Sequence, residues 1–147
     1  MDLIKHNLLL ADDDIDDCIF FKEVLEELPV ESFLTTVKDG VELMKFLNTA
    51  NLPDVLFLDL NMPRKTGHEC LSEIKKDQKL KHLPVIIFST SFDHVVANAL
   101  YDKGAHYYIR KPAEFSKLKK IIHEALTLTS APRRPQPAKE NFVLNRD

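Results

Sequence analysis

Carboxylate groups directly follow two apolar segments of the sequence, and residues of this type at these positions could bind a metal ion or accept a phosphoryl group. Residues 55–58 are all apolar, which predicts a strand buried on both faces of a sheet, and Asp59 is the first charged residue after it. Asp12 and Asp13 follow the apolar run 8–11 in the same way. We therefore expect these carboxylates at the carboxyl ends of strands, where open α/β sheets bind their ligands.

A hydroxyl group and an amine follow two later apolar segments. Ser89 comes directly after the run 85–88, and Lys111 follows the segment 106–109, just before Pro112. Each feature alone has an ordinary explanation, such as a strand-end serine or a surface lysine. The placement of all these groups at predicted strand ends favours a common site at one edge of the sheet.

This set of side chains is suited to handling an anion beside a metal ion. Carboxylates that lie close together repel one another unless a cation intervenes, and a few hard oxygen ligands open to water favour Mg²⁺. We expect Asp13, Asp59 and one backbone carbonyl to bind the ion, with Asp12 acting mainly through a bound water. The ion and Lys111 would then offset the charge of a phosphoryl group transferred to Asp59.

The intervening sequence predicts the elements that position these groups. Five strand-like segments alternate with helical ones, which predicts parallel strands with helices on both faces of the sheet. The fold class expected is α/β: a flavodoxin-like, doubly wound (βα)5 fold with five parallel strands in the order 2-1-3-4-5. Strands one and three are neighbours in that order, so Asp12, Asp13 and Asp59 should converge. The predicted inward face of the first helix consists of Ile15, Cys18, Phe21, Leu25 and Leu28.

Composition excludes several classes of protein. The 147 residues fit one domain, and a net charge of -3 gives no support for nucleic-acid binding. No segment approaches the ~20 apolar residues of a membrane-spanning helix, and the N-terminus does not resemble a signal peptide. Cys18 and Cys70 are too few for a metal motif or a disulfide framework, and we expect reduced thiols in a cytoplasmic protein.

The predicted domain covers residues 1–128, and residues 129–147 form a C-terminal tail. Three prolines break regular structure in this tail, which also contains the apolar cluster 142–144. Two interpretations are open: a flexible end in which these apolar residues are incidental, or a segment that docks on this or another protein. The sequence favours the flexible end.

Five motifs that occur in order across residues 6–128 together resemble the receiver domain of two-component response regulators (CheY-like). They are Leu-Leu-Ala-Asp-Asp at 9–13, Leu-Asp-Leu-Asn-Met-Pro at 58–63, Gly67, Pro84 with the strand that leads to Ser89-Thr90, and Lys111-Pro112. The resemblance implies a signalling protein that catalyses only its own phosphorylation and dephosphorylation, rather than an enzyme.

The resemblance also implies a role for each residue of the site. Asp59 would accept a phosphoryl group from a sensor histidine kinase or a phosphotransfer protein. Asp12 and Asp13 would hold Mg²⁺ together with Asp59 and the backbone carbonyl of Asn61. Lys111 would contact the phosphoryl group.

Two further residues would communicate the phosphorylated state. By resemblance, Ser89 moves toward the phosphoryl group, and Tyr108 moves inward as the switch residue of the fifth strand. The face made by the fourth helix, fifth strand and fifth helix would then bind a downstream protein target. The loops 63–68 and 88–91 are more similar to single-domain regulators associated with phytochrome-type kinases, for which a homodimer is plausible.

Two alternatives remain open from the sequence, and a third is set aside. A haloacid-dehalogenase-like phosphohydrolase would use Asp12 as nucleophile and Asp14 as acid-base, but it leaves the segment 59–63 unexplained. A receiver that is never phosphorylated would serve only as a scaffold. A flavin-binding module shares the topology, but three aspartates at its phosphate loop would repel the phosphate. In a receiver, Asp14 is an extra acid that should cap the first helix or face solvent.

Overall fold

The computed structural model describes residues 5–49, 51–130 and 135–145 of the chain. The strands are β1 (Lys5–Ala11), β2 (Glu31–Val37), β3 (Val55–Leu58), β4 (Val85–Ser89) and β5 (Tyr107–Arg110). The helices are α1 (Ile15–Glu27), α2 (Gly40–Leu47), α3 (Gly67–Lys76), α4 (His94–Asp102) and α5 (Phe115–Thr129), followed by a 3-10 turn, Lys139–Asn141. In this described part of the chain, no helix combines the length and apolarity needed to cross a membrane.

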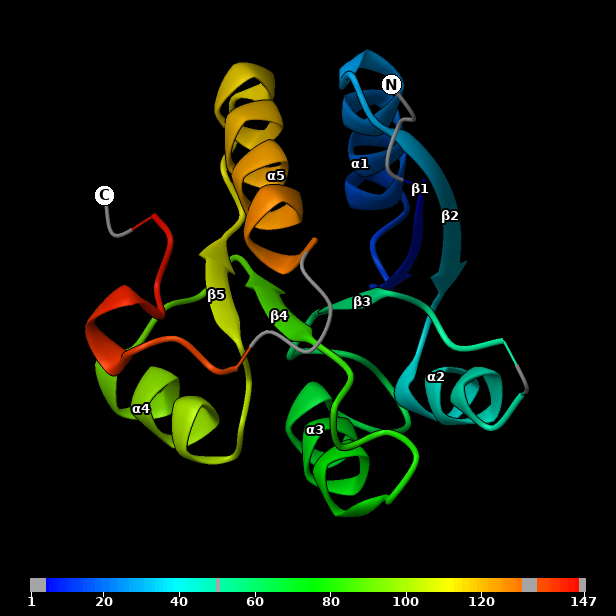
Figure 1. Cartoon of the computed structure of the whole chain (residues 1–147), viewed down its shortest axis with the longest axis vertical. Coiled ribbons are helices and arrows are strands. Elements are labelled where there is room, and N and C mark those ends of the chain that lie inside the picture. The colour runs from blue at the N-terminus through cyan, green and yellow to red at the C-terminus, as the bar shows by residue number, and fades with distance from the viewer. Residues whose placement is uncertain (1–4, 50, 131–134, 146–147) are drawn as a thin grey trace.

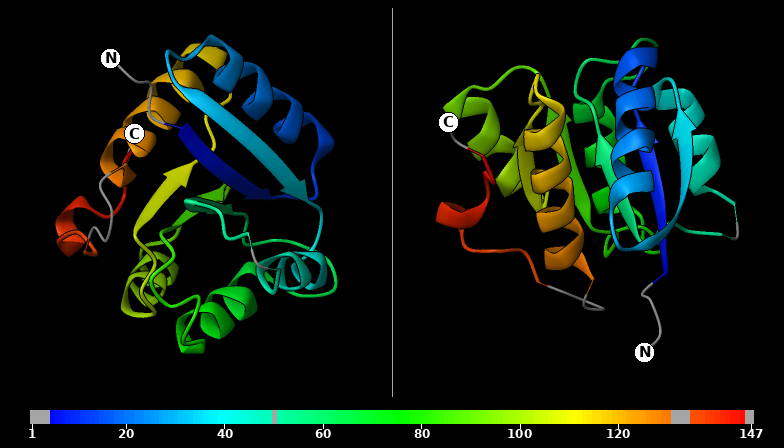
Figure 2. Two further views of the ribbon diagram at one scale, coloured as in Figure 1. Left: turned by 45° about the vertical axis from the view of Figure 1, so that its right-hand side comes forward. Right: turned by 90° about the horizontal axis from the view of Figure 1, so that it is seen from above.

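The five strands form one sheet in the order β2-β1-β3-β4-β5, and all neighbouring pairs are parallel. Helices α1 and α5 cover one face of this sheet, and α2, α3 and α4 cover the other (Figures 1 and 2). Each face has its own apolar core. The predicted fold class and strand order are therefore confirmed.

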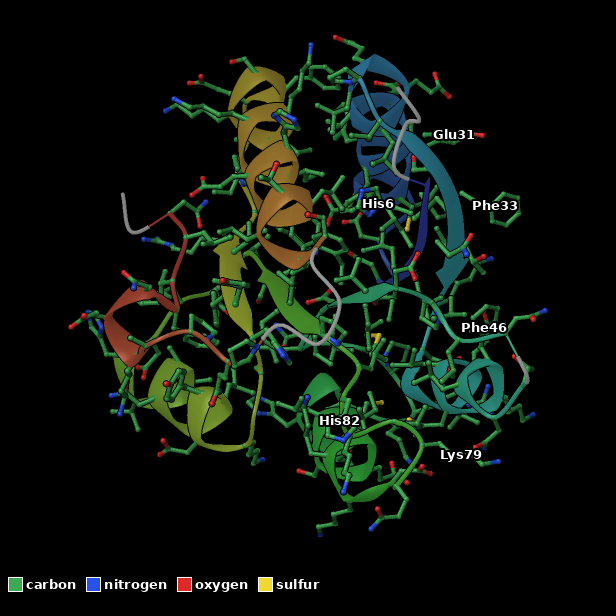
Figure 3. All side chains as sticks on the ribbon, viewed as in Figure 1. His6, Glu31, Phe33, Phe46, Lys79 and His82 are labelled. Carbon is green, nitrogen blue, oxygen red and sulfur yellow. The ribbon has the colours of Figure 1, made fainter. Side chains whose placement is uncertain are left out.

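The burial of the strands follows from their place in the sheet. Every residue of β3 and β4 is buried, as expected for central parallel strands covered by helices on both sides. The edge strand β2 is partly exposed, and Phe33 on it points away from the sheet into solvent (Figure 3).

Helix α1 buries most of its predicted inward face, but not all of it. Phe21, Leu25 and Leu28 are buried, whereas the side chain of Ile15 is 65% exposed. The prediction for Ile15 is wrong because this residue opens the helix directly after the β1–α1 loop. The first turn of α1 lies beyond the carboxyl end of β1, which is Ala11. The apolar strand side chains that cover the later turns of α1 do not extend to Ile15.

Residues 135–145 pack along β5, beside α4 (Figure 1). The backbone of Tyr108 donates a hydrogen bond to the Phe142 carbonyl at 3.0 Å and accepts one from Leu144 at 3.0 Å. Asn145 continues the pairing, since its side chain accepts from the Arg110 amide at 2.9 Å and donates to the Arg110 carbonyl at 2.7 Å. The segment thus satisfies backbone groups on the outer edge of β5, which would otherwise be an open sheet edge.

The apolar anchor of this segment is Phe142. Its side chain is 2% exposed and belongs to the same core as α2, α3 and α4. Its ring centroid lies 5.3 Å from that of Tyr101 and 6.3 Å from that of Tyr108. These contacts favour a segment that docks on this protein over a flexible end, because they supply the burial that the short apolar cluster alone could not indicate. The domain boundary at residue 128 stays a prediction.

We predict that Phe142→Ala lowers the free energy of unfolding by about 3–5 kcal/mol, because it removes a fully buried aromatic side chain. Equilibrium unfolding in urea measures this change. Phe33→Ala deletes the same side chain at a position that is 70% exposed, so it should change the free energy by less than about 0.5 kcal/mol. Equal stabilities for the two variants would show that the tail does not stabilise the domain.

Candidate metal and phosphoryl site

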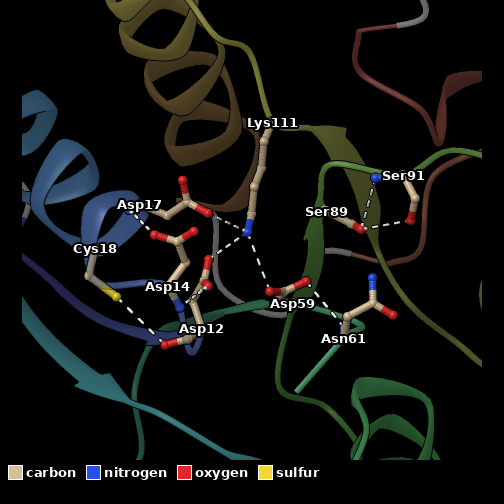
Figure 4. Close-up of polar contacts among 9 residues, drawn as sticks. All are labelled: Asp12, Asp14, Asp17, Cys18, Asp59, Asn61, Ser89, Ser91 and Lys111. Atoms are coloured by element: carbon tan, nitrogen blue, oxygen red, sulfur yellow. Dashed lines mark hydrogen bonds and ion pairs between the residues drawn. The ribbon is translucent and has the colours of Figure 1, made fainter. Parts of the chain in front are cut away.

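Parallel pairing brings the carboxyl ends of four strands to one edge of the sheet, where the polar side chains meet (Figure 4). Asp59 is the residue after β3, and its amide donates to the Ala11 carbonyl of β1 at 2.9 Å. The Lys111 amide donates to the Ser89 carbonyl of β4 at 2.8 Å. Together with the parallel pairing of β3 and β4, these backbone bonds hold the ends of the four strands in place, so the convergence expected from the strand order is observed.

Three carboxylates form the acidic part of the site. Asp12, Asp13 and Asp59 each place an oxygen so that the three atoms lie within 4.8 Å of one another. Asp12 and Asp59 are buried, whereas Asp13 is exposed. Negatively charged oxygen donors at this spacing, with one side open to water, fit a hard divalent cation that keeps part of its water shell.

The ammonium group of Lys111 lies between these carboxylates and helix α1. Its Nζ atom is 2.7 Å from Asp12 Oδ2, 2.8 Å from Asp17 Oδ2 and 3.4 Å from Asp59 Oδ2, and its side chain is only 7% exposed. The ammonium also lies 5.3 Å from the centre of the Phe88 ring. A buried cation with this many acidic partners is a fixed positive charge directly beside Asp59.

Burial and ion pairing shift the pKa values of this cluster. Burial raises the pKa of Asp12 to about 6, although the contact with the Lys111 ammonium and the hydrogen bond from the Asp14 amide act in the opposite direction. Burial alone would lower the pKa of Lys111, but its contacts with the Asp12 and Asp17 carboxylates more than offset this, and the net shift is upward. The lysine is therefore firmly protonated, as a phosphoryl-binding group must be.

Asp17 was not identified from the sequence, yet it is one of the two closest acidic partners of Lys111. It lies in the first turn of α1, whose N-cap is Asp14. No local spacing relates Asp17 to Lys111, which is 94 positions away in sequence. The contact itself depends on the long-range approach of the β5–α5 loop to α1.

Ser89 and Tyr108 lie next to the acidic cluster. The Ser89 side chain is fully buried, its hydroxyl is 3.2 Å from the Ser91 hydroxyl, and it accepts a hydrogen bond from the Ser91 amide at 3.3 Å. The Tyr108 hydroxyl donates to the Ser91 carbonyl, and burial raises its pKa. Ser91 therefore connects the hydroxyl of β4 to the aromatic ring of β5.

The Tyr108 ring is already inward in this structure, at 1% exposed. Phe92 and Phe142 lie against it, with ring centroids at 5.4 Å and 6.3 Å. An inward movement of the ring, which the family resemblance implied, is therefore not available from this conformation.

The β3–α3 loop lies against Asp59. The Asn61 amide donates to Asp59 Oδ1 at 3.3 Å, which places this residue beside the acidic cluster. A Cβ atom at Gly67 would lie 2.3 Å from the Asp59 carbonyl oxygen, so the loop can approach this closely only with glycine. A capping box between Thr66 and Glu69 then starts α3.

Asp14 acts as a helix cap. Its side chain accepts a hydrogen bond from the Asp17 amide at 3.2 Å at the N-terminus of α1, and the residue is exposed. This confirms the predicted capping role. It also argues against a phosphohydrolase in which Asp14 would face the nucleophile as acid-base.

The chain belongs to the response regulator receiver domain family, whose model matches residues 8–123. It is 31% identical over 137 residues to response regulator Rcp1 of Synechocystis sp., an alignment that covers 84% of this chain and 93% of Rcp1.

Two solved structures extend this similarity. The phosphorylated cyanobacterial phytochrome response regulator RcpA matches with a TM-score of 0.80 and 32% identity, over 90% of this chain and 99% of that one. The Mn²⁺-bound form of Rcp1 matches with a TM-score of 0.78 and 29% identity, over the same shares of the two chains. The expected resemblance to phytochrome-associated response regulators is confirmed, and the phosphohydrolase alternative is set aside.

We predict that Asp13→Asn makes the metal-free protein more stable, because it relieves repulsion worth about 1 kcal/mol at this spacing. The same change should abolish stabilisation by Mg²⁺, which for the unmodified chain should reach about 2.7 kcal/mol at a concentration 100 times the dissociation constant. Urea unfolding with and without Mg²⁺ measures both effects.

The control for this prediction is Asp16→Asn, which removes the same charge from an exposed position on α1. This variant should respond to Mg²⁺ as the unmodified chain does. Full Mg²⁺ stabilisation of the Asp13→Asn variant would place the metal outside the acidic cluster.

Proposed function

We propose that this chain is a response regulator that accepts a phosphoryl group on Asp59 in a Mg²⁺-dependent reaction. The observation that carries the proposal is the position of the buried Lys111 ammonium, 3.4 Å from Asp59 Oδ2, next to three carboxylates spaced to share one cation. A cation site and a fixed positive charge on either side of one carboxylate are what phosphoryl transfer to that carboxylate needs.

In this proposal an Asp59 oxygen attacks the phosphorus of the donor. A bond forms between that oxygen and phosphorus as the bond from phosphorus to the donor breaks, and the donor leaves with the electron pair. Lys111 stays protonated and stabilises the charge on the transferred oxygens. Asp12, Asp13, Asp59 and the Asn61 carbonyl would hold the Mg²⁺, which supplies positive charge when bound. The protein thereby catalyses only its own modification.

The phosphorylated state would be communicated through the β4–α4 loop. Ser89 is the nearest hydroxyl on β4, and any movement toward a phosphoryl group on Asp59 must break its contacts with Ser91. Ser91 also accepts the Tyr108 hydrogen bond, so the change would reach β5 without an inward swing of the ring. Residues 135–145 lie on this α4–β5 surface, and a downstream protein that binds there must contact or displace them.

The donor we favour is a phytochrome-type sensor histidine kinase, or a phosphotransfer protein that acts between such a kinase and this chain. Support comes from the similarity to RcpA and Rcp1, since the name of the first identifies it as a phytochrome response regulator. A homodimer is compatible with the proposal but is not required by the site. Neither nucleic acid nor a membrane has a role in it.

Incubation of the protein with acetyl phosphate and Mg²⁺ should add one phosphate to its mass. Intact-protein mass spectrometry measures the addition, which should disappear when Mg²⁺ is chelated. Asp59→Asn should remove it, because the amide is a far weaker nucleophile than the carboxylate. Asp54→Asn is a matched control, since this exposed residue lies just before β3, and it should be phosphorylated normally.

Phosphorylation of the Asp59→Asn variant to the same extent would contradict the proposal. If the unmodified chain gains no phosphate, beryllofluoride binding tests the same carboxylate with a smaller phosphoryl analogue. Failure of both would favour a receiver that acts as an unphosphorylated scaffold.

A further inference from the structure

Asp17 has no part in the function proposed above, although it is a principal partner of Lys111. Its Oδ2 atom lies 2.8 Å from Lys111 Nζ, a typical distance for a hydrogen bond between charged groups. The two residues are 94 positions apart in sequence, and the contact joins α1 to the loop after β5. Figure 4 shows the Asp17 carboxylate on the α1 side of the ammonium group and Asp59 on the other side.

The three acidic partners of Lys111 differ in what else they could bind. Asp12 and Asp59 belong to the group of carboxylates spaced to share a cation, and Asp17 does not. If a metal ion bound Asp12 and a phosphoryl group were attached to Asp59, these two carboxylates would interact with the new ligands and less strongly with Lys111. The Asp17 carboxylate keeps its full charge for Lys111.

Asp17 is itself held in place. It lies in the first turn of α1, where its amide is fixed by the Asp14 cap at 3.2 Å, and Phe21 anchors the following turn in the core. Its side chain is 28% exposed, compared with 7% for Lys111, so its charge remains partly solvated. A partly solvated carboxylate on a packed helix can position a buried ammonium at a smaller desolvation cost than a fully buried one.

We propose that Asp17 is the positioning residue for Lys111 in phosphoryl binding. It holds the ammonium beside Asp59, 3.4 Å from Oδ2, where the positive charge is within reach of the oxygens of a phosphoryl group on that carboxylate. Without this contact, the long and flexible lysine side chain loses its fixed position and must be ordered again when the phosphoryl group arrives. This inference rests on the function proposed for Asp59.

A double-mutant cycle tests whether Asp17 acts through Lys111. The rate of phosphorylation by acetyl phosphate at saturating Mg²⁺ is measured for the unmodified chain, Asp17→Asn, Lys111→Met and the double variant. Asp17→Asn should lower the rate roughly tenfold, the loss expected for one hydrogen bond between charged groups. In the Lys111→Met background, the same change should lower the rate by less than about twofold. Asp16→Asn should match the unmodified chain, since it removes an equal charge from the residue that directly precedes Asp17 in α1.

Nuclear magnetic resonance of the lysine side chains gives a second readout that does not depend on turnover. In the Mg²⁺–beryllofluoride complex, the Lys111 ammonium protons should exchange slowly with water in the unmodified chain and in Asp16→Asn. In Asp17→Asn their signal should broaden or disappear, while urea unfolding shows that the fold is retained.

The outcomes separate this inference from the function on which it rests. If Asp17→Asn keeps the normal rate and a sharp ammonium signal, Asp17 does not position Lys111, and the role of Asp59 is unaffected. A faster rate for Asp17→Asn would show that Asp17 competes with the phosphoryl group for the ammonium. An equally large loss in the Lys111→Met background would show that Asp17 acts through another group. Failure of the unmodified chain to react or to bind beryllofluoride overturns the proposed function and this inference together.

Discussion

The burial of one ammonium group among carboxylates is the constraint on which the rest of this site depends. Lys111 Nζ lies within 3.4 Å of Asp12, Asp17 and Asp59, which reach it from β1, α1 and β3. Burying the charge of Lys111, Asp12 or Asp59 without its partners would cost several kcal/mol. The parallel register of the strands and the packing of α1 must therefore keep all four residues together, and this leaves Asp59 next to positive charge and open to a cation beside Asp13.

Strand β5 contacts both the site, at its carboxyl end, and the C-terminal segment, along its outer edge. The Tyr108 hydroxyl donates a hydrogen bond to the Ser91 carbonyl, while the Tyr108 backbone pairs with Phe142 and Leu144 on the outer side of β5. A change in the β4–α4 loop and a change in residues 135–145 would thus both act on Tyr108. A short chain of hydrogen bonds and ring contacts therefore connects the candidate site to a surface segment.

The sequence was sufficient to predict the fold and the convergence of Asp12, Asp13, Asp59 and Lys111, because these depend on local patterns, whereas the roles of these residues stay predictions. Uninterrupted apolar runs identify buried strands such as β3, and charged residues directly after them identify the carboxyl edge of a parallel sheet. The burial of Phe142 and the role of Asp17 depend instead on contacts between distant segments, which no local period reveals. The exposure of Ile15 has a related cause, since helical spacing indicates a face but not where the sheet beneath it ends.

The most direct test of the account is a crystal structure of the protein with Mg²⁺ and beryllofluoride. We expect beryllium on an Asp59 oxygen, the cation on Asp12, Asp13, Asp59 and the Asn61 carbonyl, and the Lys111 ammonium on a fluoride atom. Beryllofluoride bound elsewhere, or a cation that avoids the three carboxylates, would contradict the central claim that this buried cluster of charges exists to accept a phosphoryl group.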